Sequence, residues 1–325
     1  MRRLLREIFD KLIELTLCPM TLVAGLYLKV LGLSRLRGGY RRTSLNRKLL
    51  KRIGVYPIVD HFYEPLFDDR RLRRSLRENR FCPALDFAEE AQLAFLNRFH
   101  FNQELLEFPL HRQDPPHFYY HNGWFEAGDA EVLYSVIRSF KPRRLIEVGG
   151  GFSTLIAQAA ILRNAREDTD LKCDHMCIEP YSNPWLERHD VHIVRMPVEE
   201  LDLDLFRSLE KNDLLFLDSS HIIRPQGDVL FAFLEVFPIL KAGTLVHVHD
   251  IFTPKDYPDE WVRAQILFWN EQYLLEAFLS FNSHYEIVGA LNFLKYKHWD
   301  NIAARCPILA SEPASEPSSF WMRRR

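Results

Sequence analysis

Two apolar runs of the sequence end in residues that could perform acid–base or metal chemistry. The run DLLFLD ends at Asp218 and is followed three residues later by His221, and the run GTLVHV is followed by His249 and Asp250. Carboxylates and imidazoles together can hold Mg²⁺ or Mn²⁺, and a histidine can instead act directly as a general base near neutral pH. We therefore take Asp218, His221, His249 and Asp250 as candidate catalytic residues, and Asp218 and Asp250 as candidate metal ligands.

A glycine-rich turn lies upstream of these residues, in the segment EVGGGFS from Glu147 to Ser153. Glycines at such a turn let the backbone adopt positive φ and approach a ligand closely. The start of the following helix favours an anionic or polar group. A dinucleotide-binding fingerprint would place its third glycine where Thr154 stands, and would not have the acid Glu147. An unliganded tight turn is the alternative interpretation.

A parallel sheet is needed to bring the turn and the strand-end residues together. From residue 127 onward, short apolar runs alternate with longer amphipathic ones, which is typical of such a sheet. In a parallel sheet the carboxyl ends of the strands face one crevice, so the strand-end residues should converge. The predicted fold class is α/β: a Rossmann-like, doubly wound, mostly parallel sheet with a helical N-terminal extension. The main expected strands are 144–148, 174–179, 191–195, 213–218, 243–250 and 285–290, and the helices include 129–140, 226–240 and 258–280.

The segment EVGGGFST resembles the first motif of the class I S-adenosylmethionine-dependent methyltransferases, acid-x-Gly-x-Gly-x-Ser/Thr. The resemblance implies S-adenosylmethionine as the cofactor, and an acid at the end of the second strand that binds both ribose hydroxyls. Glu179 stands at that place, and a carboxylate can accept two hydrogen bonds from a cis-diol. The cofactor-binding residues implied in this way are Glu147, Gly149, Gly151, Ser153, Thr154, Glu179 and Asp218.

The pairing D-x-x-H and then H-D resembles the cephalosporin-hydroxylase-like and the sugar or macrolide O-methyltransferases. The chain retains Asp228 and Gly243 of that pattern, but has Ser219 in place of its usual glycine. The resemblance implies methyl transfer to a hydroxyl of a sugar, a glycan or a small secondary metabolite, and leaves dependence on Mg²⁺ or Mn²⁺ open. It extends to a final antiparallel strand near residues 319–322. The alternatives are a non-catalytic cofactor-binding scaffold and a nicotinamide-dependent oxidoreductase.

The composition favours a globular enzyme over a nucleic-acid-binding protein. Apolar residues make up 47% and charged residues 26%, and the net charge is −2. Five cysteines without the spacing of a disulfide framework favour reduced thiols and a cytoplasmic location. We expect a small-molecule or glycan acceptor as partner and no nucleic acid; the sequence does not specify an oligomeric state.

The N-terminal region differs in charge from the rest of the chain. Residues 1–52 contain 13 Lys or Arg and 3 acids, a net charge of +10, which leaves the remainder at −12. Residues 15–28 have no charge but are too few to span a bilayer. They are expected either to contact a membrane surface peripherally or to pack on the body. The predicted organisation is a basic helical arm (1–60), a helical or irregular lid or connector (61–121) and a methyltransferase domain (122–325).

Overall fold

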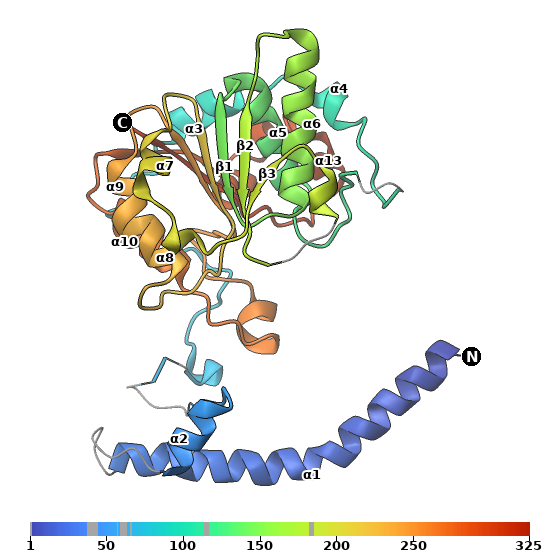
Figure 1. Ribbon diagram of the computed structural model, residues 1–325, viewed down its shortest axis with the longest axis vertical. Helices are drawn as coiled ribbons and strands as arrows, with labels where there is room; N and C mark the ends of the chain where they lie inside the picture. Colours follow the sequence, from blue (N-terminus) through green and yellow to red (C-terminus); the bar gives the residue numbers. More distant parts are fainter. Residues whose placement is uncertain are drawn as a thin grey trace. The chain divides into compact units, whose positions relative to one another are not determined.

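The computed structural model describes residues 2–37, 45–56, 58, 64–65, 67–113, 117–181 and 185–325. The chain forms two compact units, residues 1–74 and residues 75–325. The first contains the helices α1 (Arg2–Arg37) and α2 (Leu45–Arg52) and the 3-10 turn η1 (Asp69–Arg71), which confirms the helical N-terminal region (Figure 1). Of the expected arm, residues 38–44, 57, 59 and 60 lie outside the described residues. Within the described part of the chain, no helix is both long and apolar enough to cross a membrane.

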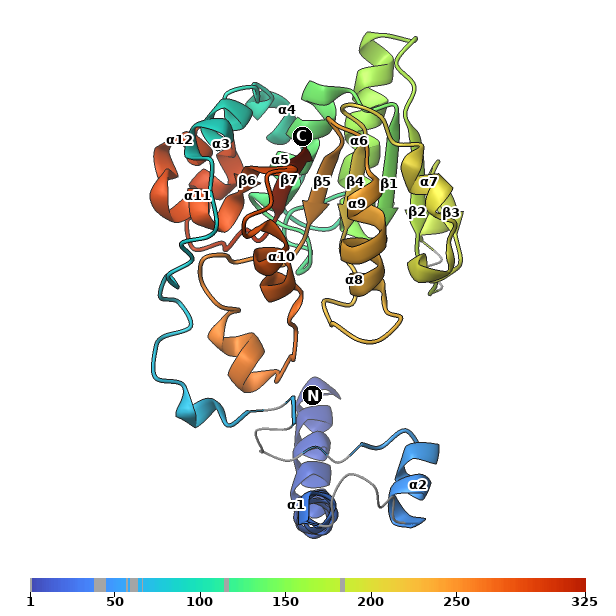
Figure 2. The same ribbon diagram turned by 90° about the vertical axis from the view of Figure 1, so that its left-hand side faces the viewer.

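The second unit is built on a seven-stranded sheet in the order β3-β2-β1-β4-β5-β7-β6 (Figure 2). The first five strands run parallel, and β7 pairs antiparallel with both β5 and β6. The predicted fold class and the final antiparallel strand are therefore confirmed. The strands are β1 (Arg144–Val148), β2 (Asp174–Ile178), β3 (His192–Val194), β4 (Leu214–Leu217), β5 (Leu245–Val248), β6 (Tyr285–Ala290) and β7 (Phe320–Arg324).

Helices cover both faces of this sheet (Figures 1 and 2). Against one face pack α3 (Glu89–Leu96), α4 (Asn102–Leu105), α5 (Asp129–Phe140), α6 (Phe152–Glu167), α11 (Leu291–Lys297), α12 (Trp299–Ala303) and α13 (Pro307–Ser311). Against the other pack η3 (Val198–Glu200), α7 (Leu203–Arg207), α8 (Asp228–Phe231), the π-helical turn η4 (Ala232–Val236), α9 (Phe237–Ile239) and α10 (Glu271–Leu279). The short turn η2 (Leu186–Arg188) precedes β3.

The alternation of side chains along the strands divides the apolar residues between two cores. Leu214 and Phe216 of β4 point to the α5–α6 face, whereas Leu215 and Leu217 point to the α8–α10 face. All four side chains are buried, as expected for a parallel strand that is covered on both faces. The sheet is thus a rigid platform whose strand ends can position reactive groups.

The prediction of one continuous helix over 258–280 is wrong. A π-helical turn, η5 (Glu260–Ala264), is followed by Ile266 with φ +56°, and α10 begins only at Glu271. A β-branched residue with positive φ interrupts a right-handed helix. The interruption lets the backbone N–H groups of Asn270 and Glu271 donate to the carbonyl of His221, which fixes the start of α10 beside a candidate catalytic residue.

Residues 75–121 lie in the same compact unit as the sheet, in contrast to the boundary expected at residue 122. Phe95 and Leu96 of α3, and Phe99 after it, are buried in the core on the α5–α6 face. The Gln92 side chain also accepts a hydrogen bond from the Ala290 N–H of β6 at 2.7 Å. This segment therefore completes the core of the body. Residues 114–116 are outside the described residues.

Candidate functional site

The candidate catalytic residues lie at the carboxyl ends of β4 and β5. The backbone N–H of Asp218 donates to the carbonyl of Val148 in β1, and that of His249 donates to the carbonyl of Leu217, each at 2.9 Å. These sheet hydrogen bonds hold Asp218 and His249 in register at one edge. The strand order reverses between β1 and β4. Ligands of open α/β sheets bind in the crevice at such a reversal.

The glycine turn after β1 is packed against the end of β4. Gly149 has φ +86°, and a Cβ atom there would overlap the carbonyl oxygen of Asp218. A Cβ atom on Gly150 would overlap the sulfur of Cys177. Glycine is therefore required at both positions, by conformation and space at Gly149 and by space at Gly150. By contrast, a Cβ atom on Gly151 would meet no atom within 4 Å.

A cavity of about 360 Å³ opens beside this turn. It combines backbone groups of the turn, two carboxylates and several aromatic rings, which is a suitable lining for a cofactor that contains a nucleoside. The free space next to Gly151 shows that the turn leaves room for such a group. The lining residues are Trp124, Phe125, Gly149, Gly150, Gly151, Phe152, Ser153, Glu179, Trp185 and Asp218.

The Glu179 side chain is held at the wall of the cavity. Its Oε2 accepts a hydrogen bond from the Gly150 N–H at 3.2 Å, and its Oε1 accepts one from the Tyr181 N–H at 2.8 Å. Each carboxylate oxygen has a second lone pair for a ligand. The structure thus places Glu179 where the resemblance required it, with its orientation already fixed.

Glu147 and Thr154 were expected to line the cofactor site, and in both cases the structure places the side chain behind the cavity wall. Glu147 is buried, and its two oxygens are bonded to the Ser153 hydroxyl at 2.6 Å and to His175 Nε2 at 2.9 Å. The Thr154 hydroxyl accepts a hydrogen bond from the Gly151 N–H at 3.1 Å. Both side chains therefore hold the turn in shape, because a buried polar group must be paired within the protein. Ser153 lines the cavity as expected.

The imidazole of His221 lies among three carboxylates. Its Nε2 is 3.3 Å from Asp218 Oδ1 and 3.4 Å from Asp250 Oδ2, and its Nδ1 is 2.9 Å from Glu271 Oε2. The ring of Trp269 packs against it at 4.3 Å between centroids, with the two planes tilted by 42°. His221 is thus fixed at both nitrogens and on one face.

His249 occupies the other side of the same cluster. Its Nδ1 is 3.6 Å from Asp218 Oδ2 and 3.5 Å from Asp250 Oδ1, and its Nε2 is 3.6 Å from Asp129 Oδ2. Ser318 donates to Asp250 Oδ1 at 3.1 Å. The structure thus brings all four candidate catalytic residues together, and Asp218 connects this cluster to the cofactor cavity. We call Asp218, His221, His249 and Asp250 the acid–imidazole cluster.

Two residues of the acid–imidazole cluster have strained backbones. His221 has φ +59° and Asp250 has φ +58°. A residue with a side chain adopts this left-handed region at a cost of about 1 kcal/mol or more. The surrounding hydrogen bonds hold this geometry. In the loop before His221, for example, Asp228 accepts from both the N–H and the hydroxyl of Ser220 at 2.7 Å.

The cluster shifts the pKa values of its members strongly. Burial lowers the pKa of His221, but the hydrogen bonds with Asp218 and Glu271 outweigh it and raise the pKa to about 10. The pKa of His249 is likewise raised above its usual range, because Asp250 and Asp218 outweigh burial. Asp218 has a lowered pKa, since the nearby imidazolium groups outweigh burial, whereas burial raises the pKa of Asp250. Both imidazoles are therefore cationic at neutral pH when nothing else neutralises the carboxylates.

The donor set also fits a divalent cation. One atom each of Asp218, His221 and Asp250 can be chosen such that all three lie within 4.8 Å of one another. Around a Mg²⁺ ion with ligands at about 2.1 Å, neighbouring donors are about 3 Å apart and opposite ones about 4 Å. His221 Nε2 lies 3.3 Å from Asp218 Oδ1 and 3.4 Å from Asp250 Oδ2, and both distances are close to that between neighbouring donors. Glu271 on the second nitrogen of His221 is the kind of outer partner that orients histidine ligands.

Sequence reasoning missed four residues of this site: Asp129, Trp269, Glu271 and Ser318. Each lies far from its partner in the sequence: Glu271 is 50 positions from His221, and Ser318 is 68 from Asp250. An acid at the start of a helix after Gly128 was the one sequence signal for Asp129, and helix capping explains such an acid equally well. His247, two residues before His249 on the same strand, is fully buried, stacks on Phe216 at 4.0 Å and is bonded to Ser319, so it belongs to the core.

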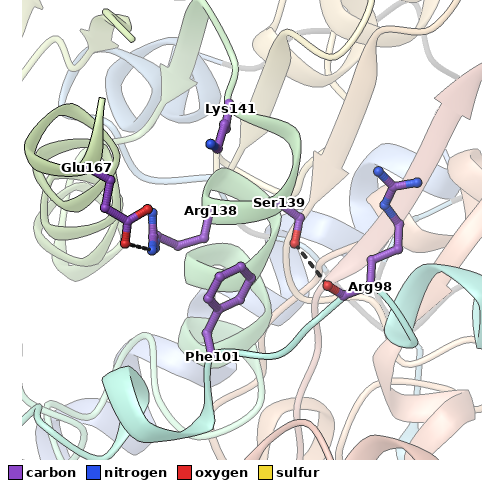
Figure 3. A pocket seen from close by; sticks show the side chains of 6 residues that line it. All are labelled: Arg98, Phe101, Arg138, Ser139, Lys141 and Glu167. Atoms are coloured by element: carbon purple, nitrogen blue, oxygen red, sulfur yellow. Dashed lines mark hydrogen bonds and ion pairs between the residues drawn. The ribbon is translucent and has the colours of Figure 1, made fainter. Parts of the chain in front are cut away.

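A second pocket, of about 500 Å³, lies near the start of β1 and is shown in Figure 3. Arg138 dominates it, but its guanidinium is paired with Glu167 at 2.5 Å and with Glu104 at 2.9 Å. None of the residues of the acid–imidazole cluster lines this pocket. The Arg138 guanidinium therefore holds α5 to α4 and α6. The candidate site is the smaller cavity at the opposite edge of the sheet.

Comparisons with known proteins agree with this geometry. Residues 146–251, which contain the glycine turn and both strand ends, match the family described as a methyltransferase domain. An uncharacterised protein of Archaeoglobus fulgidus is 30% identical over 189 residues, which cover 53% of this chain and 80% of that protein.

Two solved structures are similar at low sequence identity. An O-methyltransferase from Bacillus cereus in complex with SAH is 12% identical, with a TM-score of 0.33 over 71% of this chain and 91% of that one. A putative protein-L-isoaspartate O-methyltransferase from Plasmodium falciparum in complex with S-adenosyl-L-homocysteine is 15% identical, with a TM-score of 0.26 over 42% and 66% of the two chains.

Proposed function

Since this chain belongs to the class I S-adenosylmethionine-dependent methyltransferases, we propose that it methylates a hydroxyl oxygen of a sugar, a glycan or a small secondary metabolite. When bound, the cofactor would supply a methyl group on a sulfonium sulfur: the acceptor oxygen would bond to the methyl carbon, the carbon–sulfur bond would break, and S-adenosylhomocysteine would leave. The observation that supports oxygen as the acceptor atom is the double role of Asp218. Its side chain lines the cofactor cavity and also contacts His221 and His249. The protein can thus remove a hydroxyl proton beside the methyl donor.

The carboxylates are the proton acceptors in this proposal. The neighbouring carboxylates raise the pKa of both imidazoles, so these act as cations that hold Asp218 and Asp250 in place. Asp218 is the accessible member, with 34% of its side chain exposed, whereas that of Asp250 is 12% exposed. An acceptor hydroxyl can therefore donate to Asp218 from the cavity side. Positioning of the two reactants provides most of the remaining acceleration in a direct transfer of this kind.

We propose metal binding as the alternative to proton acceptance by Asp218: in that case Asp218, His221 and Asp250 would hold Mg²⁺ or Mn²⁺ during turnover. Two imidazolium groups face four carboxylates, those of Asp129, Asp218, Asp250 and Glu271. This leaves an excess of negative charge in a buried place, which a divalent cation would neutralise. Such an ion would lower the pKa of the acceptor hydroxyl and orient it. Proton release from His221 would accompany binding, since a histidine ligand must be neutral.

Aromatic rings around the cluster favour a sugar as the acceptor. Trp269 packs against His221 in a tilted arrangement, and Trp261 lies 5.0 Å from Trp269 in an edge-on arrangement. On the cavity side, Trp124 is 80% exposed. Exposed aromatic faces beside carboxylates can bind the apolar face of a sugar ring while the carboxylates bind its hydroxyls.

Calorimetric titration with S-adenosylhomocysteine, with and without Mg²⁺, tests the cofactor site first. We expect micromolar binding, and the Asp250→Ala variant should bind almost as tightly as the wild type. A screen with radiolabelled S-adenosylmethionine and glycan, glycolipid and polyketide acceptors then tests transfer, which Asp250→Ala should abolish. Full turnover by Asp250→Ala would refute the assignment of the acid–imidazole cluster. Acceptors methylated only on nitrogen would refute the choice of oxygen.

Binding of Mn²⁺, followed by electron paramagnetic resonance, tests the metal site without relying on activity. The wild type should bind one ion at micromolar concentration, and Asp250→Ala should lose it. Equal binding by both proteins would place the ion elsewhere, and turnover that persists at full rate in excess EDTA would exclude a role in catalysis.

A further inference from the structure

The middle of α1 presents apolar side chains in every direction. Leu15, Met20, Leu22, Val23 and Leu26 are between 57% and 71% exposed. Successive residues of a helix point about 100° apart, so Leu22 and Val23, together with Leu17, which is 50% exposed, point to three different sides of the helix. A helix that is apolar all round belongs in an apolar environment. The 14 residues from 15 to 28 contain no charged side chain.

The threonine hydroxyls of this segment are satisfied within the helix. The hydroxyl of Thr16 donates to the carbonyl of Ile13 at 3.2 Å, and that of Thr21 donates to the carbonyl of Leu17 at 3.0 Å. Pro19 lies inside α1, and proline has no N–H that would need a partner. The two threonines can therefore enter an apolar phase without burying unpaired hydroxyl donors.

The second helix of the same unit is amphipathic. Leu45, Leu49 and Ile53, spaced four residues apart and 59–81% exposed, follow one side of α2 and its end. Lys48 and Lys51 are exposed between them. A basic helix with an exposed apolar stripe is typical of segments that lie in a membrane interface.

We propose that the N-terminal unit docks peripherally on an anionic phospholipid surface, with the uncharged segment of α1 inserted at the boundary between headgroups and acyl chains. Charge supports this partner over a second copy of the chain, since residues 1–52 have a net charge of +10 and would repel one another. Length supports insertion in the interface over crossing: 14 helical residues extend about 21 Å, against a hydrocarbon thickness of about 30 Å. This proposal is independent of the proposed function.

Flotation of the full-length protein with lipid vesicles tests the proposal. Vesicles of equimolar phosphatidylglycerol and phosphatidylcholine should bind the protein about tenfold or more tightly than pure phosphatidylcholine, and about 0.5 M NaCl should weaken that binding. The variant Leu22→Glu/Leu26→Glu should lose about tenfold or more in affinity, because charged groups cannot enter the apolar boundary. Lys48→Glu/Lys51→Glu should weaken the preference for anionic vesicles, because it lowers the net charge of residues 1–52 from +10 to +6.

The control variant is Leu234→Glu/Phe281→Glu, which changes two exposed apolar residues of the second unit, 62% and 93% exposed. It should bind vesicles like the wild type, and all variants should keep the wild-type circular dichroism spectrum. Absence of wild-type binding, or equal binding by Leu22→Glu/Leu26→Glu, would overturn the proposal. The proposal would also be overturned if the wild type bound no vesicles but self-associated in sedimentation, and if Leu22→Glu/Leu26→Glu abolished that self-association. The uncharged segment of α1 would then pack against a second copy of the chain. Resistance to extraction by alkaline carbonate would overturn the peripheral arrangement.

Discussion

Glu271 Oε2 lies 2.9 Å from His221 Nδ1, and the same His221 accepts the N–H of Glu271 at its backbone carbonyl. The two residues are thus hydrogen-bonded to each other through both their side chains and their backbones. The loop that follows β4 and the start of α10 therefore form one rigid element. Because His221 Nε2 faces Asp218 and Asp250, Glu271 determines how the imidazole is presented to both carboxylates.

Replacing Glu271 by Gln should lower methyl transfer about 10- to 100-fold while leaving affinity for S-adenosylhomocysteine nearly unchanged. The amide keeps the size of the side chain but removes the charge that orients and protonates His221. Steady-state rates and calorimetry on one preparation check this. The exposed Glu235→Gln is the matched control and should behave as wild type in both. A fall in cofactor affinity that equals the fall in rate would contradict a role confined to the acid–imidazole cluster.

Replacing Glu179 by Ala should weaken S-adenosylhomocysteine binding about 100-fold, because two charge-assisted hydrogen bonds to a diol are worth about 3 kcal/mol together. Calorimetry measures the loss directly. Glu187→Ala, on the nearby turn η2 and 55% exposed in its side chain, should retain wild-type affinity. Equal losses in both variants would indicate a general effect of charge, and no loss in Glu179→Ala would remove this residue from the site.

Two glycine substitutions should separate folding from binding. Gly149→Ala places a Cβ atom against the Asp218 carbonyl at a positive φ, so the melting temperature should fall by several degrees. Gly151→Ala meets no protein atom within 4 Å, so its melting temperature should change little. Its methyl group nevertheless enters the cavity, and cofactor affinity should fall. Differential scanning fluorimetry with and without S-adenosylhomocysteine measures both effects. If Gly149→Ala weakened cofactor binding and Gly151→Ala only lowered the melting temperature, the cavity would not be the cofactor site.

Phe95→Ala should destabilise the second unit by about 3–5 kcal/mol, the usual cost of removing a buried phenylalanine. Phe95 is 3% exposed, stacks with Phe140 and packs against Trp321 in a tilted arrangement. Urea unfolding measures the loss. The control Phe81→Ala, at a side chain that is 87% exposed, should cost less than about 0.5 kcal/mol. A small effect at Phe95 would restore the view of residues 61–121 as a separate connector.

The carboxylate of Glu316 should make stability depend on pH in the acid range. Burial raises its pKa, but hydrogen bonds from Tyr296, Asn292 and Lys295 and the charge of Arg77 outweigh it and lower the pKa to about 2. A lowered folded-state pKa contributes stability that is present above about pH 4.5 and is lost as the pH falls through about 2. Since 32% of the side chain is exposed, we expect about 1–2 kcal/mol.

Urea midpoints of the wild type and of Glu316→Gln, measured from neutral pH downward, test this expectation. The variant should be less stable at neutral pH, and the difference should shrink as the pH decreases. A difference that stays constant over the whole range would mean that Glu316 contributes through its shape and not through its charge.

Local patterns in the sequence were sufficient to predict the fold class and the centre of the site. The glycine turn, the strand ends at Asp218 and at His249-Asp250, and the acid Glu179 all lie within a few residues of an apolar strand. Sheet geometry then requires these residues to meet at one edge, because parallel strands that share a register present their carboxyl ends together. For this reason the convergence of Asp218, His221, His249 and Asp250 could be predicted without knowing a single long-range contact.

Tertiary structure alone decided what surrounds that centre. Glu271 reaches His221 because Ile266 interrupts the expected helix, and Ser318 reaches Asp250 because β7 returns beside β5. Glu147 points away from the cavity because His175, on the neighbouring strand, provides a buried partner for it. Sequence periodicity reports which face of an element is apolar, but not which distant polar group satisfies a buried charge. That choice depends on packing across the whole unit.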